Sequence, residues 1–250
     1  MTAPVLAAGT AQLLHLFFEW LALATGVQLY RWQRRRARQP ALLQPGSFAV
    51  VVGCILGAAI GNKLVFWIEM PHLWQSAAPD WRLIASGQSI VGGLLGGLLG
   101  VEIAKKLAGV MRSTGDQFIL PLVVGTVVGR IGCFLAGLHD GTYGVPTALP
   151  WGVDFGDGIA RHPTQVYDML FALGMGALLW QGRATLARSS GLAFKLYLAS
   201  YLAWRLLVDA IKPVPYAYAF GLSGIQLVCV LALLCYLPFV LRQSMEIRTT

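Results

Sequence analysis

Two stretches, GRIGCFLAG at residues 129–137 and RHPTQVY at residues 161–167, decide how this chain of 250 residues is interpreted. The first puts Arg130 inside an apolar segment, and the second puts Arg161 just ahead of another. An arginine at membrane depth costs roughly 2.5–3.5 kcal/mol on insertion scales, so a chain that keeps one there is expected to use it on an anion. In a bilayer the abundant anion is a lipid phosphate. The two stretches therefore indicate a membrane protein with an anion site.

The composition also indicates a membrane protein. Hydrophobic residues make up 56% of the chain and charged residues 12%, which is not typical of a soluble domain. The length allows about seven spans of ~20 residues, and nothing indicates a second domain. We predict an all-α, polytopic transmembrane domain over residues 1–250. The apolar runs predict spans near 11–30, 46–68, 88–104, 117–137, 164–181, 193–211 and 222–241.

The distribution of basic residues predicts the orientation. Thirteen of the 19 basic residues follow the first, third, fifth or seventh run, and that side is expected to be cytoplasmic. The N-terminus then lies outside, the C-terminus lies in the cytoplasm, and the site faces the outer leaflet of a bacterial inner membrane. The other basic residues lie within spans or at their outer ends: Lys63, Arg82, Arg130, Arg161, Arg205 and Lys212.

The net charge of +8 needs no nucleic-acid partner, because topology-setting residues account for most of it. The basic cluster from Arg31 to Arg38 is either such an anchor or a surface for anionic lipid headgroups.

All four cysteines fall in apolar stretches without metal-type or disulfide-type spacing, so neither a metal site, a cofactor nor a disulfide framework is expected. Cys133 is either a small apolar filler or a nucleophilic thiol activated by nearby arginines.

Small residues recur at helical spacing in two of the predicted spans. Such spacing lets helices approach closely. Alternatively, Gly92 and Gly93 open a gap for a lipid beside Ser89. The glycines in question are Gly53, Gly57, Gly61, Gly92, Gly93, Gly96 and Gly100.

The loop over residues 138–163 is rich in glycine, proline and aspartate, which favour fixed turns. Tyr143, Trp151 and Phe155 suit the headgroup level of a membrane. We therefore predict a structured outer cap between the fourth and fifth spans.

With these motifs, the chain resembles the prolipoprotein diacylglyceryl transferase family. These integral membrane enzymes move diacylglycerol from phosphatidylglycerol to the lipobox cysteine of lipoprotein precursors. The resemblance covers nearly the whole chain in span order. Its specific part consists of Gly129, Arg130, Gly132 and Phe134, then Arg161, His162, Pro163, Gln165 and Tyr167, and finally Tyr201, Arg205 and Gln226.

Several positions depart from the family pattern. Cys133, Ala136 and Leu138 stand where the family has two asparagines and a glutamate. Val91 replaces a histidine before a Gly-Gly pair, and Phe18 most nearly aligns with a tyrosine. These departures indicate a divergent member. The alternative is a catalytically silent relative that binds a phospholipid or a lipoprotein as a carrier, sensor or assembly partner.

The resemblance assigns roles to several side chains. Arg130 and Arg205 would clamp the leaving phosphate, because guanidinium groups match phosphate oxygens in pairs; the alternative is structural pairing with Asp168 or Asp209. Tyr201 would act beside them, and Arg161 would order the cap.

Because Val91 replaces the family's histidine, His139, next to Asp140, is the candidate base that would deprotonate the thiol. His162 would position the helix that follows it.

The remaining candidates are substrate-binding residues. Gln165, Tyr167 and Gln226 follow from the resemblance, and Glu19 is an intramembrane acid expected to pair with Lys63 or Arg205. The expected partners are a phosphatidylglycerol-like lipid, the membrane itself, and a lipoprotein precursor or another thiol or hydroxyl acceptor.

Overall fold

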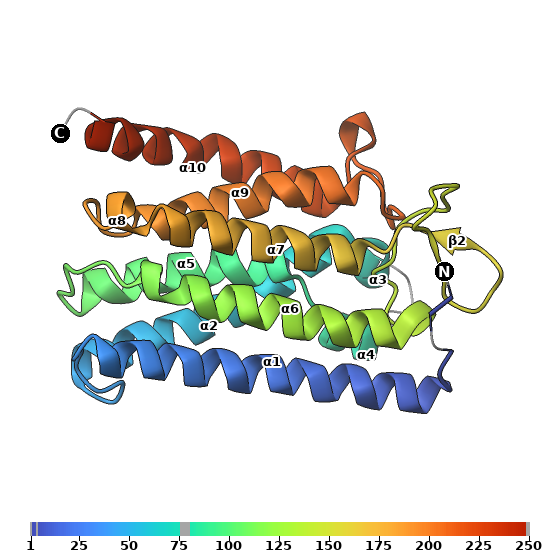
Figure 1. The fold of residues 1–250 in the computed structure, drawn as a ribbon, viewed down its shortest axis with the longest axis horizontal. Coiled ribbons are helices and arrows are strands. Elements are labelled where there is room, and N and C mark those ends of the chain that lie inside the picture. The colour runs from blue at the N-terminus through green and yellow to red at the C-terminus, as the bar shows by residue number, and fades with distance from the viewer. Residues whose placement is uncertain (1, 4, 76–80, 249–250) are drawn as a thin grey trace.

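The computed structural model describes residues 2–3, 5–75 and 81–248. Within these residues the chain is mainly helical, and Figure 1 shows the long helices running side by side along the longest axis. Seven helices have 18 residues or more: α1 (Ala8–Arg36), α2 (Pro45–Glu69), α5 (Ile90–Leu107), α6 (Ile119–Ala136), α7 (Thr164–Gln181), α9 (Leu192–Asp209) and α10 (Gly224–Arg248).

Short elements connect the long helices. They are the helices α3 (His72–Gln75), α4 (Trp81–Ser86) and α8 (Arg183–Leu186), the 3-10 turns η1 (Gly115–Phe118), η2 (Gly137–His139) and η3 (Ala219–Gly221), and the strands β1 (Val153–Asp154) and β2 (Ala160–Arg161).

Each predicted apolar run corresponds to one long helix. Among the described residues, four helical stretches are long and apolar enough to cross a membrane: Ala8–Arg36, Pro45–Glu69, Gly115–His139 and Gly224–Glu246. α9 is not one of these four stretches, because it contains the charged residues Lys195, Arg205 and Asp209. Two of those residues belong to the site described below.

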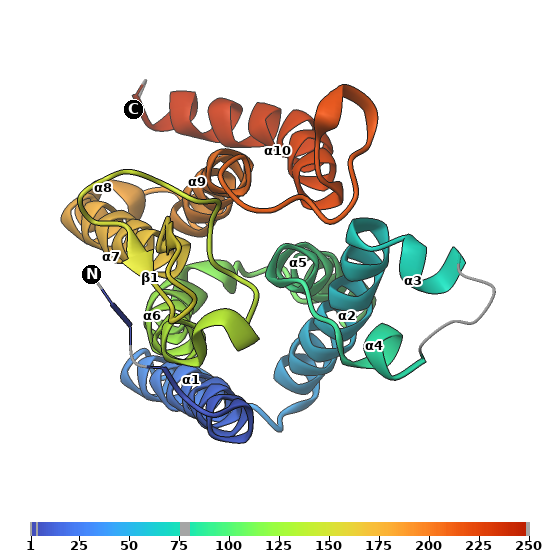
Figure 2. The same cartoon turned by 90° about the vertical axis from the view of Figure 1, so that its right-hand side faces the viewer.

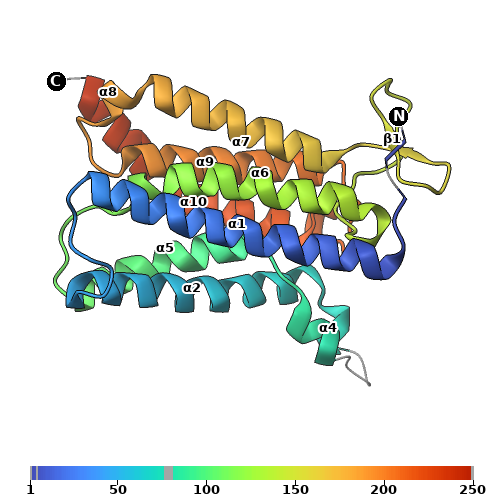
Figure 3. The same ribbon diagram turned by 60° about the horizontal axis from the view of Figure 1, so that its bottom comes forward.

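The two ends of the bundle differ. α1 begins at the end that carries the β1–β2 segment, and α10 finishes at the opposite end (Figure 1). Seen from the β1–β2 end, α6 lies between α1 and α7, while α3 and α4 lie outside the bundle beside α2 (Figure 2). Figure 3 shows α2 and α5 running together along one side.

The glycines of α2 and α5 interlock. A Cβ atom at Gly57 would lie 2.2 Å from the carbonyl oxygen of Gly96, and one at Gly61 would lie 2.3 Å from that of Gly92. Side chains at these positions are incompatible with the observed spacing, so the two backbones touch. Gly92 therefore serves helix packing. Gly93 is different, since a Cβ there would meet only a carbonyl oxygen of Ala58 at 4.0 Å.

A buried apolar cluster joins α5, α9 and α10. It contains Val91, Leu198, Tyr201, Leu202 and Cys229. Val91 is 1% exposed and contributes to this packing.

The predicted cap is a short antiparallel β-hairpin with ordered turns. Val153 pairs with Arg161, and the backbone N–H of Ala3 donates to Asp154 O at 2.8 Å, which ties the start of the chain to the cap. Asp154 Oδ1 accepts hydrogen bonds from the backbone N–H groups of residues 156, 157 and 158. The all-α prediction missed this small sheet, because strands of two residues leave no periodic pattern in a sequence.

Candidate active site

Buried charged side chains from three helices converge near the β1–β2 end of the bundle. Nη2 of Arg130 on α6 lies 2.8 Å from Oδ2 of Asp168 on α7. Nη1 of Arg205 on α9 lies 3.8 Å from the same carboxylate oxygen, and its Nη2 lies 2.7 Å from Oδ1 of Asp209. Both predicted arginines thus share one acidic partner. The pairing with Asp168 and Asp209, which was the structural alternative to a phosphate clamp, is present and joins the two arginines in one cluster.

Lys212 and Trp204 complete this cluster. Nζ of Lys212 lies 3.9 Å from Asp168 and 3.7 Å from Asp209, and Nε1 of Trp204 donates to Asp168 Oδ1 at 2.8 Å. Lys212 follows the end of α9. Burial, together with repulsion from the two arginines, lowers the pKa of the Lys212 ammonium to about 8. Its charge is therefore the most easily lost of the three cations.

The cluster retains positive charge and unused donors. Three cations face two carboxylates, Asp168 and Asp209, which leaves one positive charge. Arg130 and Arg205 are only 6% and 7% exposed, and within the described residues their Nε atoms have no hydrogen-bond partner. Burying charges costs several kcal/mol per ion unless partners compensate, so such an arrangement is better explained by ligand binding than by stability.

The arginines open onto a pocket of about 300 Å³. Arg130, Arg205 and Lys212 contribute to its wall from one side, and Ser89 and Val91 contribute from the start of α5. The other residues that line it are Phe66, Glu69, Met70, Gln88, Ile90, Asp140, Gly141, Thr142, Asp209, Pro213, Pro215, Ser223 and Ile225.

Two further carboxylates in this wall have their own partners. Glu69 Oε2 accepts the backbone N–H of Ile225 at 2.6 Å. Asp140 lies 3.1 Å from Nδ1 of His15 and accepts the hydroxyl of Thr142. Burial alone would raise the pKa of Asp140, but the bonds from His15 and Thr142 and the nearby Arg130 hold it below its usual value.

His15, which was not predicted from the sequence as a site residue, lies beside the arginine cluster. Its ring nitrogen, Cys133 Sγ and a carboxylate oxygen of Asp140 all lie within 4.8 Å of one another. Arg130 links this group to the anion cluster, because its Nη1 donates to Cys133 Sγ at 3.8 Å. An ionisable residue in an apolar span is a functional candidate. His15 lies one helical turn before Glu19 and meets the same criterion.

The structure places His139 elsewhere. It is exposed in η2 and is not among the residues that line the arginine pocket of the described chain. The neighbouring Asp140 pairs with His15 instead. Gly137, with φ +59°, ends α6, and the η2 turn begins there. His139 as the base stays a prediction, and His15 has the stronger geometric case.

Three of the predicted substrate-binding residues build the cap. Arg161 donates to both oxygens of Asp157, at 2.7 and 2.6 Å, and lies over the ring of Tyr143. His162 Nδ1 lies 3.2 Å from the hydroxyl of Tyr167, which also accepts from Trp151 Nε1 at 2.8 Å. This network joins the cap to the start of α7. Arg161 thus contacts two residues of the cap, and its role in substrate binding stays a prediction.

Ser89 and Gln226 cap helices. Ser89 Oγ accepts the Gly92 N–H at the start of α5, and Gln226 forms a reciprocal capping box with Ser223 at the start of α10. Ser89 also lines the arginine pocket. Tyr201 is 5% exposed in the core cluster. Gln165 is fully buried, its side-chain amide has no hydrogen-bond partner in the part of the chain that the structure describes, and its role in substrate binding stays a prediction.

The expected ion pair of Glu19 is not formed. Among the described residues, Lys63 instead donates to the carbonyl oxygens of Ala85 and Gly87, and Arg205 is paired with Asp168 and Asp209. Glu19 is partly buried on α1. Its predicted role in binding substrate remains untested.

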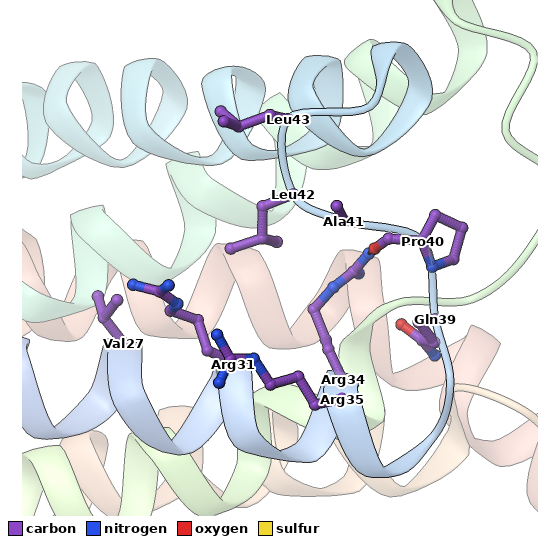
Figure 4. Close-up of a pocket in the computed structure, with 9 residues that line it drawn as sticks. All are labelled: Val27, Arg31, Arg34, Arg35, Gln39, Pro40, Ala41, Leu42 and Leu43. Carbon is purple, nitrogen blue, oxygen red and sulfur yellow. Dashed lines mark hydrogen bonds between the residues drawn. The ribbon is translucent and has the colours of Figure 1, made fainter.

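A second, larger pocket of about 560 Å³ lies at the opposite end of the bundle. Figure 4 shows Arg31, Arg34 and Arg35 of α1 facing the loop before α2. Arg34 donates to Pro40 O at 2.6 Å and to Ser47 Oγ at 3.0 Å, so it holds this loop in place. The pocket wall is mainly apolar, with no carboxylate among its lining residues. It shows no convergence of side chains suited to chemistry.

The chain is similar to proteins of one known family. The sequence model of the prolipoprotein diacylglyceryl transferase family matches residues 16–242. The chain belongs to this family. Its arginine cluster thus lies in the part that the family model covers, whereas His15 lies one residue ahead of that part. Val91, predicted from the sequence to replace a histidine, lines the arginine pocket.

Individual family members are about one-third identical to the chain. The phosphatidylglycerol–prolipoprotein diacylglyceryl transferase of Bordetella bronchiseptica is 33% identical over 167 residues, covering 65% of this chain and 62% of its own length. That of Bordetella avium is 33% identical over 206 residues, with 76% and 73% covered. That of Clostridium tetani is 30% identical over 205 residues, with 78% and 79% covered. The first match therefore spans less than two-thirds of the relative.

Proposed function

We propose that this family member transfers diacylglycerol from phosphatidylglycerol to a cysteine thiol of a lipoprotein precursor. The observation that carries the proposal is the convergence of Arg130 and Arg205 on Asp168 at the wall of a pocket. Both arginines line this pocket, and guanidinium groups bind phosphate oxygens as they bind carboxylates. The relatives named for this reaction support the choice of donor and acceptor.

The reaction suits a cluster with excess positive charge. The acceptor sulfur forms a bond to the terminal glyceryl carbon of the diacylglycerol unit, and the bond from that carbon to the phosphate oxygen breaks. The thiol proton passes to a base, and glycerol phosphate leaves with the bonding electrons. Negative charge therefore grows on the phosphate, where Arg130 and Arg205 would stabilise it. Lys212 would add to this stabilisation while it is protonated.

The same proposal includes the membrane arrangement. All seven long helices would cross a bacterial inner membrane, with the β1–β2 cap outside and the Arg31–Arg38 cluster in the cytoplasm. Support comes from the opposite positions of the start of α1 and the end of α10 (Figure 1). It also comes from the basic residues near the end opposite the cap. The arginine pocket would then open near the outer leaflet, where secreted precursors emerge.

A catalytically silent relative that only binds lipid is the second candidate. The specific observation in its favour is Val91, because an apolar side chain faces the pocket where the family has a histidine. A silent relative would retain phosphatidylglycerol without releasing glycerol phosphate.

The test uses purified protein in phosphatidylglycerol vesicles with a peptide that carries a lipobox cysteine. Glycerol phosphate release and the mass of the peptide are followed together. The same peptide with serine in place of cysteine is the matched control. We expect release and a diacylglyceryl mass gain with the cysteine peptide alone. Release without peptide modification would reject the proposed acceptor, and bound lipid without release would favour the silent relative.

A further inference from the structure

The cluster of His15, Cys133 and Asp140 has the composition of a transition-metal site. One nitrogen, one sulfur and one carboxylate oxygen lie within 4.8 Å of one another, and they come from α1, α6 and the turn after η2. Imidazole, thiolate and carboxylate together are typical zinc ligands, and a set of three leaves the fourth tetrahedral position open. An open position is the mark of a zinc site that acts on a bound molecule.

The distances require only a small contraction. Zinc lies about 2.3 Å from sulfur and about 2.0–2.2 Å from nitrogen or oxygen, so tetrahedral ligands lie roughly 3.3–3.7 Å apart. His15 Nδ1 and Asp140 Oδ1 are already 3.1 Å apart. The three ligand atoms all lie within 4.8 Å of one another, so their separations exceed the tetrahedral value by about 1 Å at most. Rotation of the side chains would close this difference.

The surroundings also fit a metal. The Thr142 hydroxyl donates to the second oxygen of Asp140, which orients the carboxylate as outer partners of metal ligands do. Deprotonated Cys133 and Asp140 would balance the two charges of Zn²⁺. Arg130 lies next to Cys133, but its pairing with Asp168 at 2.8 Å compensates part of its charge. The side chain of His15 is 35% exposed, which leaves one side of the cluster accessible.

We propose that His15, Cys133 and Asp140 bind a zinc ion whose open position holds the acceptor thiol as a thiolate. This inference rests on the proposed function for the identity of the acceptor. A metal-bound thiolate does not require the histidine that Val91 replaces, because the metal itself displaces the thiol proton. Arg130 contacts both Cys133 and the anion cluster, so sulfur and phosphate would be held side by side, as the displacement needs. The sequence indicated no metal site, because His15 lies more than 100 residues before Cys133 and Asp140 in the chain.

The direct test is cobalt binding by the detergent-purified full chain. Cobalt replaces zinc in such sites and reports its ligands in the absorption spectrum. We expect about one metal ion per chain, a sulfur-to-cobalt charge-transfer band and the visible bands of tetrahedral cobalt. Cobalt that binds without the sulfur band, or no tight binding at all, would overturn the proposal. This readout on the unmodified protein does not depend on the folding of any variant.

Paired variants locate the site. Cys133→Asn, which introduces the residue of the family pattern, and His15→Ala should abolish the sulfur band or lower metal affinity at least tenfold. Cys229→Ser and His139→Ala are matched controls outside the cluster and should retain the spectrum. Retention of the sulfur band by Cys133→Asn would contradict the assignment.

The lipobox peptide separates this inference from the proposed function. Adding the cysteine peptide should intensify the sulfur band, whereas the serine peptide should leave it unchanged. Glycerol phosphate release that survives complete metal removal would overturn the zinc site and leave the transferase proposal intact. A cobalt site that responds to the peptide in a protein that releases no glycerol phosphate would overturn the transferase proposal and support the metal site.

Discussion

Two arginine-lined pockets lie at opposite ends of the helical bundle and differ in what their arginines do. In the pocket beside α1, Arg34 holds one local loop, and the lining contains no carboxylate. In the pocket near the cap, Arg130 and Arg205 come from different helices, are buried and share Asp168. The first pocket is the larger, at about 560 Å³ against about 300 Å³. Convergence of buried charges, and not size or arginine number, therefore identifies the candidate site.

The largest expected effect concerns the shared carboxylate. Asp168→Asn leaves Arg130 and Arg205 without their common counter-ion, so we expect a loss of about 3–5 kcal/mol in the free energy of unfolding. Arg34→Ala, in the other pocket, removes hydrogen bonds to Pro40 and Ser47 and should cost about 1–3 kcal/mol. Denaturation in detergent micelles measures both. Equal costs would remove the distinction between the two pockets.

The arginines of the two pockets should also differ strongly in their effect on the rate of catalysis. Arg130→Ala or Arg205→Ala should lower the rate of glycerol phosphate release by about 10²–10³-fold, because each removes a donor to the growing phosphate charge. Arg31→Ala, on the exposed side of α1 in the other pocket, should leave the rate nearly unchanged. The initial rates of glycerol phosphate release in phosphatidylglycerol vesicles measure both effects. A large loss with Arg31→Ala would weaken the assignment.

Two histidine variants test which histidine belongs to the site. His15→Ala should lower the rate roughly 100-fold, because it removes a group next to Asp140 and Cys133 that helps to deprotonate or bind the acceptor thiol. His139→Ala should have little effect, since its side chain is exposed in η2. The reverse order of effects would restore the sequence-based choice of His139.

Lys212 predicts a pH dependence that the pocket beside α1 lacks. The pKa of Lys212 is about 8, so its charge is lost as the pH rises through that value, and affinity for phosphatidylglycerol should fall severalfold. Between pH 8 and about 10.4 the unfolded chain binds more protons at this residue than the folded chain does. The contribution of Lys212 to the free energy of unfolding therefore increases with pH over this range. Lys212→Arg should abolish both trends. Lipid retention and denaturation measured across this pH range provide the check.

The smallest effect is expected in the cap. The pKa of Asp157 lies below its usual value because Arg161 donates hydrogen bonds to it, but the carboxylate is exposed to solvent. Exposed pairs contribute little to stability. Asp157→Asn should leave the thermal midpoint unchanged within error and alter the rate by less than about twofold. A large loss of activity would show that the cap pair belongs to the site.

The seven long helices could be predicted from the sequence because each contains an apolar run. Arg130 and Arg205 could be singled out, since arginines are rare in apolar spans, and the structure brings both to Asp168. Their role in binding phosphate stays a prediction. The partnership of His15, Cys133 and Asp140 could not be predicted, because His15 meets the other two only through the packing of α1 against α6. The capping role of Gln226 was missed for a different reason. Its S-x-x-Q signal was present at Ser223, but the family resemblance suggested a substrate contact instead.

Lipid retention tests the central claim most directly. Native mass spectrometry of the protein released from phosphatidylglycerol-containing micelles reports whether a lipid stays bound. We predict that the wild type and the double variant Arg31→Ala/Arg35→Ala retain one phosphatidylglycerol, and that Arg130→Ala/Arg205→Ala loses it while remaining folded. Retention by the folded Arg130→Ala/Arg205→Ala protein, together with loss from the Arg31→Ala/Arg35→Ala protein, would contradict the account and move the lipid site to the other end of the bundle.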